Sequence, residues 1–163
     1  MNWQRLTLIV LVPLAFVPAG SSQTRKIKFV DCPVTIPRAT PDSVLSAVGM
    51  RNAYWNGNLY VGAFWPDATV RVGPLSVGSI LPDGSLDMKF PWFRAAGLKG
   101  KLIITGRRLD AEAPPLKAHI PSGYLDTGFQ ATGLIFPTEG CWEITGKVGD
   151  TTLTFVNRVI RAE

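Results

Sequence analysis

Histidine and cysteine are scarce in this sequence: its 163 residues include one histidine and two cysteines. A zinc or blue-copper site made of several histidines and cysteines within one chain is therefore excluded. Charged residues are also few, at 18%, whereas 46% of the residues are hydrophobic. A disordered chain has the opposite balance, so the composition indicates a folded protein of about one domain.

Motifs of phosphate binding and of serine hydrolysis are absent as well. The sequence has 16 glycines but no glycine-rich phosphate loop and no G-x-S-x-G turn. Any catalytic triad would have to use His119, which lies beside a proline in a short candidate edge strand. We predict no cofactor, no metal and no enzymatic activity. A hydrolase that uses His119, or the neighbouring carboxylates Asp110 and Glu112, is the alternative.

Residues 1–21 have the features of a secretory signal. Arg5 precedes Leu6–Val17, a run of 12 residues interrupted only by Thr7 and Pro13, and small residues follow. A helix that spans a bilayer needs about 20 apolar residues, so this run is short for an anchor. We predict a cleaved signal and an exported bacterial protein, with an uncleaved membrane anchor as the alternative.

The positive charge of the chain does not indicate a nucleic-acid partner. Removal of residues 1–21 takes away Arg5 and no acid, which leaves 16 basic and 12 acidic residues and a net charge of +4. These charges are spread along the chain without a basic stripe or a known nucleic-acid-binding module. We interpret them as surface charge.

The two cysteines, Cys32 and Cys141, predict one disulfide, because an even number in an exported chain favours pairing. Cys141 falls on the polar side of a predicted strand at residues 141–148. The bond would therefore hold the N-terminal segment against the outer side or an end of a sheet, outside the core. A reactive thiol is the alternative, although neither cysteine has a histidine nearby in sequence or forms a C-x-x-C motif.

Alternation of apolar and polar residues dominates the sequence after the signal and predicts strands. It is clearest at residues 85–93, where Pro91 predicts a sheet edge or a bulge. Gly149 and Asp150 predict a hairpin turn between two later strands. About seven to nine short strands without a long helix indicate an all-β sandwich or barrel of antiparallel strands. The other main strands are predicted at residues 59–65, 69–72, 101–109, 116–120, 129–136, 141–148 and 151–160.

The domain organisation follows from the distribution of proline. Residues 22–52 contain Pro33, Pro37 and Pro41, so we predict an extended N-terminal segment with at most one helical turn near residues 43–48. Residues 53–163 are predicted to form the β-sandwich domain.

The C-terminal part of the chain resembles a family of uncharacterised exported bacterial proteins. The resemblance rests on FQATGLIFPTEGCWEITGKVGD at residues 129–150 and on LTFV at residues 153–156. GRRLD at residues 106–110 and APPL at residues 113–116 fit the same family, so the resemblance covers roughly residues 56–159. It implies an exported immunoglobulin-like β-sandwich. It implies no catalytic residue, since the family has no assigned function.

Aromatic residues at strand ends are the candidate recognition surface. Phe93 is out of phase with the core side of its strand, and Trp55 precedes a strand, so both are expected to be exposed. Such rings can stack on sugars or bind an apolar patch of a partner. Trp55, Phe93 and Arg94 are therefore the candidate ligand-binding residues. They favour a non-enzymatic binding or structural module of the cell envelope, with an envelope protein or a glycan as partner. A carbohydrate-binding module is the alternative.

Arg107 and Arg108 are adjacent in a predicted strand, so their side chains point to opposite faces. One of them must face inward, cap a sheet end or lie at a bulge. A buried arginine needs a carboxylate partner, and Asp110 and Glu143 are the candidates. Arg107, Arg108 and Asp110 are thus predicted as candidate buried charges.

Overall fold

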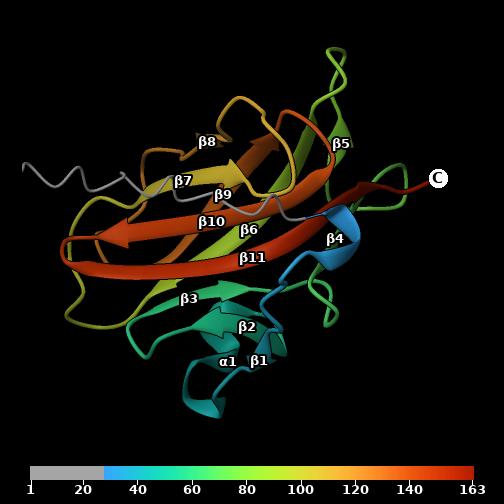
Figure 1. Ribbon diagram of the computed structural model, residues 1–163. Helices are drawn as coiled ribbons and strands as arrows, with labels where there is room; N and C mark the ends of the chain where they lie inside the picture. The colour runs from blue at the N-terminus through green and yellow to red at the C-terminus, as the bar shows by residue number, and fades with distance from the viewer. Residues whose placement is uncertain (1–27) are drawn as a thin grey trace, which may run out of the picture.

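The computed structural model describes residues 28–163, which form eleven strands, one short α-helix and one 3-10 turn (Figure 1). The predicted signal at residues 1–21 lies outside the described residues. In the part that the structure describes, no helix has the length and apolarity needed to cross a membrane. The elements are η1 (Phe29–Asp31), β1 (Arg38–Ala39), α1 (Asp42–Val48), β2 (Asn52–Trp55), β3 (Leu59–Gly62), β4 (Thr69–Val72), β5 (Ser79–Ile80), β6 (Leu86–Arg94), β7 (Ile103–Arg108), β8 (Lys117–His119), β9 (Gly128–Phe136), β10 (Gly140–Val148) and β11 (Thr151–Arg161).

The strands form two packed sheets. One has the order β1-β2-β3-β6-β9-β8, with β5 also paired to β6, and the other has the order β4-β11-β10-β7. Strands β3-β6-β9-β8 and β7-β10-β11 reproduce the A-B-E-D and C-F-G sheets of an immunoglobulin sandwich. The prediction of an all-β, immunoglobulin-like sandwich is confirmed. The hairpin at Gly149 and Asp150 is also present, and Gly149 has the positive φ (56°) that a tight hairpin turn requires.

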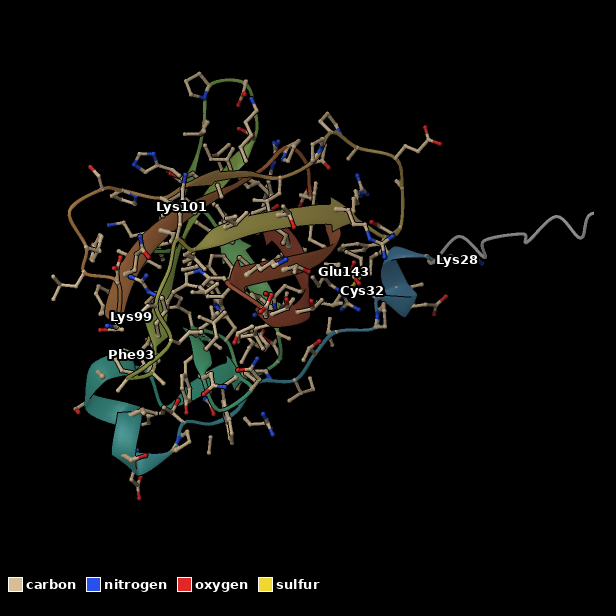
Figure 2. The ribbon with its side chains drawn as sticks, turned by 90° about the vertical axis from the view of Figure 1, so that its left-hand side faces the viewer. Lys28, Cys32, Phe93, Lys99, Lys101 and Glu143 are labelled. Carbon is tan, nitrogen blue, oxygen red and sulfur yellow. A yellow bond between two sulfur atoms is a disulfide. The ribbon has the colours of Figure 1, made fainter. Side chains whose placement is uncertain are left out.

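The predicted disulfide is present between Cys32 and Cys141, 109 residues apart. It lies in a small apolar cluster with Val156 on the outer side of the second sheet, as the register of its strand predicted. Thr35 extends the attachment, because its backbone N–H donates to Val156 O and its hydroxyl accepts from Val156 N–H, both at 2.9 Å. Figure 2 shows Cys32 at the end of the molecule opposite to Phe93 and Lys101.

Residues 28–52 do more than wrap around the sandwich. Strand β1 pairs with β2 and so adds an edge strand to the first sheet. The helical turn expected near residues 43–48 is α1, which ends at Gly49 with a left-handed φ of 71°. Val44 and Met50 pack on the outer side of the sheet against Ala53 and Tyr60. They therefore cover part of the face that carries the predicted aromatic surface.

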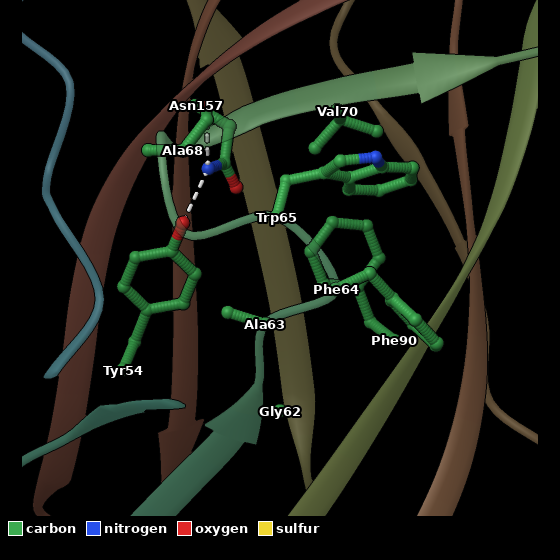
Figure 3. A pocket seen from close by; sticks show the side chains of 9 residues that line it. All are labelled: Tyr54, Gly62, Ala63, Phe64, Trp65, Ala68, Val70, Phe90 and Asn157. Carbon is green, nitrogen blue, oxygen red and sulfur yellow. Dashed lines mark hydrogen bonds between the residues drawn. The ribbon is translucent and has the colours of Figure 1, made fainter. Parts of the chain in front are cut away.

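Strand β4 departs from the prediction of antiparallel strands, because it runs parallel to β11. The chain leaves the first sheet after β3 and reaches the edge of the second through a turn in which Ala68 has a φ of 56°. Asn157 of β11 holds this turn, since its amide donates to Ala68 O at 3.0 Å and to the Tyr54 hydroxyl at 2.6 Å (Figure 3). The adjoining cavity of about 10 Å³ has room for about one water molecule, so it is no ligand site.

Pro91 also departs from its prediction, since β6 is an interior strand. On one side β6 pairs with β9 along its whole length. On the other side β3 pairs with residues 92–94 and β5 with residues 86–87. Pro91 lies in the interval between these two partners, where a residue without a backbone N–H leaves no ladder bond unmade.

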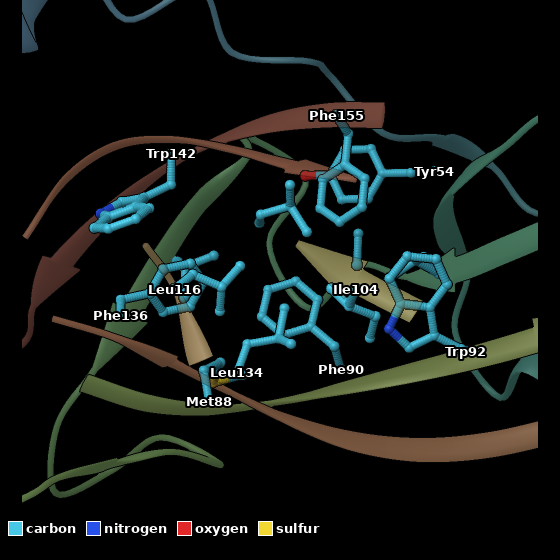
Figure 4. Packing of buried hydrophobic residues seen from close by; sticks show 14 of the residues in the cluster. Tyr54, Met88, Phe90, Trp92, Ile104, Leu116, Leu134, Phe136, Trp142 and Phe155 are labelled. Carbon is cyan, nitrogen blue, oxygen red and sulfur yellow. The ribbon is translucent and has the colours of Figure 1, made fainter. Parts of the chain in front are cut away.

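The core lies between the sheets and consists mainly of aromatic and branched side chains. Figure 4 shows Phe90 near its centre, Trp92 toward one end and Trp142 toward the other. Trp92 is fully buried and its six-membered ring lies directly against Gly146 of the facing strand β10. A side chain at residue 146 would occupy the same space as that ring, so this glycine lets the two sheets approach.

We predict that Gly146→Ala lowers the free energy of unfolding by roughly 1–3 kcal/mol, because the new methyl group overlaps the buried Trp92 ring. The matched control is Gly133→Ala in β9, where the new atom would lie 3.2 Å from the movable Asp87 carboxylate. The control should remain within about 1 kcal/mol of the wild type. Chemical denaturation of both variants measures the difference, and equal losses would contradict the proposed contact.

We predict that the double variant Cys32→Ala/Cys141→Ala loses about 4–5 kcal/mol of unfolding free energy. The bond closes a loop of more than a hundred residues, and its loss restores chain entropy to the unfolded state. Denaturant titration of the variant and of the oxidised wild type gives the value, with mass spectrometry to verify the bond. A loss below about 1 kcal/mol would show that the bond does not constrain the unfolded chain.

Candidate functional site

A cleft of about 380 Å³ opens at the end of the sandwich where β6 ends and β9 begins. We call it the Arg94 cleft. Its walls are the loop from β6 to β7 and the loop from β8 to β9, the connections B–C and D–E in immunoglobulin order. In antibody variable domains the B–C loop also belongs to the binding end. The cleft is lined by Arg94, residues 100–102, residues 120–126 and Gln130.

Arg94 is the central residue of the cleft. It continues the inward phase of β6 beyond Trp92, and only 3% of its surface is exposed. Its Nη1 donates to Gly100 O at 2.8 Å and its Nη2 donates to Leu125 O, so one guanidinium joins both loops. Gly100 has a φ of 127°, a backbone conformation that glycine adopts most readily, and its carbonyl is thereby available to Arg94.

The charge of Arg94 is not neutralised by an ion pair within residues 28–163, since its hydrogen bonds go to backbone carbonyls. Burial lowers the pKa of Arg94, whereas the carboxylate of Asp126 acts in the opposite direction. The buried Nε has no hydrogen-bond partner in this part of the chain. A buried cation without a paired anion is costly. The cleft therefore contains a buried positive charge that no ion pair within residues 28–163 balances.

Gln130 adds a second unsatisfied group to the same cleft. It pairs with Trp92 across the β6–β9 ladder and is 8% exposed. Its Oε1 is buried and lacks a partner among the described residues. Since the two ends of a side-chain amide can exchange places, Gln130 can offer a donor or an acceptor to a bound molecule.

The rim of the cleft carries charges of both signs. Lys101 and Asp126 both line it, and both are exposed. Lys99 is also exposed and close in sequence, but it does not line the cleft. Figure 2 shows Lys99, Lys101 and Phe93 at the same end of the molecule. The cleft thus combines two cations, one carboxylate and an amide.

A row of aromatic rings crosses the outer face of the first sheet beside this end. The strand register places Trp55, Tyr60, Phe93 and Phe129 opposite one another on β2, β3, β6 and β9. Ring centroids are 6.0 Å apart from Trp55 to Tyr60 and again from Tyr60 to Phe93. Tyr124, which lines the Arg94 cleft, packs edge to face on Phe129 at 6.1 Å.

The three predicted ligand-binding residues, Trp55, Phe93 and Arg94, lie at one end of the first sheet, but they differ in solvent exposure. Trp55 and Phe93 are half-buried where exposure was expected, because they pack against Tyr60 and its apolar neighbours. The Arg38 guanidinium also lies 3.9 Å from the Trp55 ring centre. Arg94 is buried and lines the cleft. The exposed rings at this end are instead Phe129, at 44%, and Tyr124, at 38%.

The candidate buried charges lie at the opposite end of the second sheet. Arg107 is exposed and its Nε donates to Glu143 at 2.7 Å on the outer face. Arg108 faces the other way, with its Nε 2.7 Å from the Asp110 carboxylate, of which only 3% is exposed. Asp110 also accepts the backbone N–H of Cys141 at 3.0 Å. This ion pair therefore supports the strand that holds the disulfide.

Among residues 28–163, no hydrogen bond joins His119, Asp110 and Glu112, the residues of the hydrolase alternative. Asp110 is held by Arg108, while Glu112 and His119 are exposed, His119 on the edge strand β8. Within residues 28–163 there is no group of three or more His, Cys, Asp or Glu side chains that could hold a metal ion.

The residues that line the cleft together with Arg94 were not predicted from the sequence, among them Lys101, Tyr124, Asp126 and Gln130. Gln130 alone had a usable signal, because it shares the inward phase of β9 with buried residues. Comparison with known protein families gave no match, and neither did comparison with curated proteins or with solved structures. The resemblance of the C-terminal part to an exported family therefore stays a prediction.

We predict that Asp110→Asn lowers the free energy of unfolding at pH 7 by about 3 kcal/mol, since it removes the ion-pair partner of the largely buried Arg108. Burial would raise the pKa of Asp110, but hydrogen bonds from Arg108 and Cys141 outweigh it and hold the pKa below its usual value. The carboxylate therefore stabilises the fold above the ordinary pKa of about 3.9, and this contribution is lost as the pH falls further.

Denaturation of wild type and variant between pH 7 and pH 2 measures this effect. The variant should lack the part of the acid-induced loss that Asp110 causes. The matched control is Glu143→Gln, which removes the ion-pair partner of the exposed Arg107 and should cost less than about 1 kcal/mol. Parallel pH profiles for wild type and Asp110→Asn would rule out the assigned role.

Proposed function

We propose that the protein is an exported, non-enzymatic binding module of the bacterial cell envelope, and that its ligand occupies the Arg94 cleft. One observation carries the proposal: a buried arginine without an ion-pair partner lines a cleft of about 380 Å³ formed by two loops of an immunoglobulin-like sandwich. That volume falls within the roughly 300–1,000 Å³ of small-molecule sites.

Export is supported by the signal-like residues 1–21 and by the disulfide. A disulfide of this kind persists in oxidising compartments outside the cytoplasm. Figure 2 shows Cys32 at one end of the molecule and Lys101, which lines the cleft, at the other. A binding site at the end away from the disulfide is accessible to a partner in the envelope.

The carbohydrate-binding alternative has support from a different part of the surface than expected. Trp55 and Phe93 are half-buried in the aromatic row, so they offer little free ring area. The rings of Tyr124 and Phe129 are more exposed, and Tyr124 lines the cleft. The hydrolase alternative has no comparable support, since His119, Asp110 and Glu112 do not form a catalytic group.

We predict that a bound ligand shifts the backbone NMR signals of residues 95–102 and 120–127 in the 15N-labelled protein. The probes are a panel of monosaccharides, disaccharides, amino acids and short peptides at millimolar concentration. Signals around Arg107 and Glu143 on the outer face serve as the internal control and should not move. A panel without any saturable shift, or shifts confined to another face, would contradict the proposed site.

A further inference from the structure

We infer that the ligand of the Arg94 cleft is an acidic saccharide, whose carboxylate is held by the positive charge of Arg94 and Lys101 while its hydroxyl groups bond to Gln130 and Asp126. The inference rests on the proposed function and names its ligand class. It goes beyond the surface formed by Trp55 and Phe93, which the fold largely covers.

The carboxylate follows from the charge balance of the cleft. Arg94 uses two of its five N–H donors on backbone carbonyls, and Nε is left without a partner in the described chain. Lys101 adds a second cation at the rim, whereas Asp126 is the sole carboxylate that lines the cleft. An incoming anion would neutralise the excess positive charge. Bonds between a guanidinium and a carboxylate are also among the stronger hydrogen bonds in proteins.

The saccharide follows from the other groups in the cleft. Gln130 has a buried amide oxygen that needs a donor, and Asp126 accepts hydrogen bonds but would repel a simple anion. A ligand that carries hydroxyl groups beside its carboxylate meets both demands. The Tyr124 ring lines the cleft and is fixed by its edge-to-face contact with Phe129. An aromatic ring held in this way can pack against the C–H face of a sugar.

A peptide with a free C-terminal carboxylate fits these groups less well. Its C-terminal residue offers one carboxylate and one N–H, which would satisfy Arg94 and Gln130 but leave Asp126 facing the same carboxylate. A phosphate monoester would bring up to two negative charges next to Asp126, more than the single excess positive charge of the cleft. The saccharide is therefore the class that we argue, and the other two are outcomes of the test.

The test measures binding by calorimetry, with a free-carboxylate tripeptide and a sugar phosphate as the competing ligand classes. The acidic oligosaccharides are four: trimers of galacturonic, glucuronic and mannuronic acid, and sialyllactose. Each is compared with its carboxyl-reduced, neutral counterpart. At least one acidic sugar should bind roughly tenfold more tightly than its neutral form, which corresponds to one charge-assisted contact. The affinity should weaken as the NaCl concentration rises, because the attraction includes exposed charge.

Three variants assign that binding to the cleft. Lys101→Gln should weaken the acidic sugar several-fold and leave the neutral form unchanged, while the matched control Lys99→Gln should change neither. Arg94→Lys keeps the charge but loses the fork that holds both loops, and we expect a loss of roughly tenfold or more. Tyr124 is exposed, so Tyr124→Ala should not disturb the fold. It should weaken binding of the acidic and neutral forms alike, since it removes the ring contact without changing the charge.

The outcomes separate this inference from the proposed function. Equal binding of acidic and neutral sugars in the cleft would overturn the acidic class, and so would preferential binding of a free-carboxylate tripeptide or of a sugar phosphate. Each of these results would leave a binding module in place. Absence of binding by all four acidic sugars would overturn the inference even when the NMR panel identifies another ligand. Equal effects of Lys101→Gln and Lys99→Gln would also overturn it.

Discussion

The contact between Trp92 and Gly146 sets the distance between the two sheets, and the position of the cleft depends on it. The indole is fully buried and lies where any side chain at residue 146 would lie. Beyond this ring the core ends in smaller buried side chains, among them Leu59, Leu102 and Val148. The next inward position of β6 belongs to Arg94, which pairs with the buried Leu59 of β3 and bonds to two loops.

Arg94 then determines how these loops are arranged. The N–H groups of a buried guanidinium need hydrogen-bond acceptors in place of water. The carbonyl oxygens of Gly100 and Leu125 are two such acceptors for Arg94. One cation thus joins the loop from β6 to β7 and the loop from β8 to β9, which also pack Leu98 and Ile120 against the core. Carbonyl oxygens solvate the cation without cancelling its charge. The same interaction that orders the cleft therefore leaves it positively charged.

Alternation in the sequence was sufficient to predict most of the sandwich. Residues 85–93 were predicted as a strand and β6 covers Leu86–Arg94, and the two cysteines allowed one pairing, which is present. The direction of β4 was not predictable, because alternation defines a strand but not its neighbour. Pro91 was misplaced for the same reason: an interior strand can have two successive partners on one side, with a proline between them.

Sequence patterns could predict only part of the cleft. Arg94 follows Trp92 in phase, so its burial could have been expected, and it was already a candidate for binding. Lys101 and Asp126 belong to loops that have no periodicity, and only the pairing of β6 with β9 brings those loops together. Exposure of Trp55 and Phe93 failed as an expectation because the residues that cover their surroundings, Val44 and Met50, come from the segment predicted to be extended.

The buried arginine at one end of the sandwich has an ion-pair partner and the one at the other end does not, and this difference supports the assignment of the site. At the disulfide end, Arg108 is paired with Asp110, whose second role is to accept the N–H of Cys141, so the charges balance within the fold. At the cleft end, Arg94 has carbonyl partners alone and an unpartnered Nε within the described chain. A residue that only tied two loops together would not need to keep a buried, unpaired positive charge, which is costly. An unpaired cation in a cleft is what an anionic ligand requires, because the ligand then supplies the missing half of the ion pair.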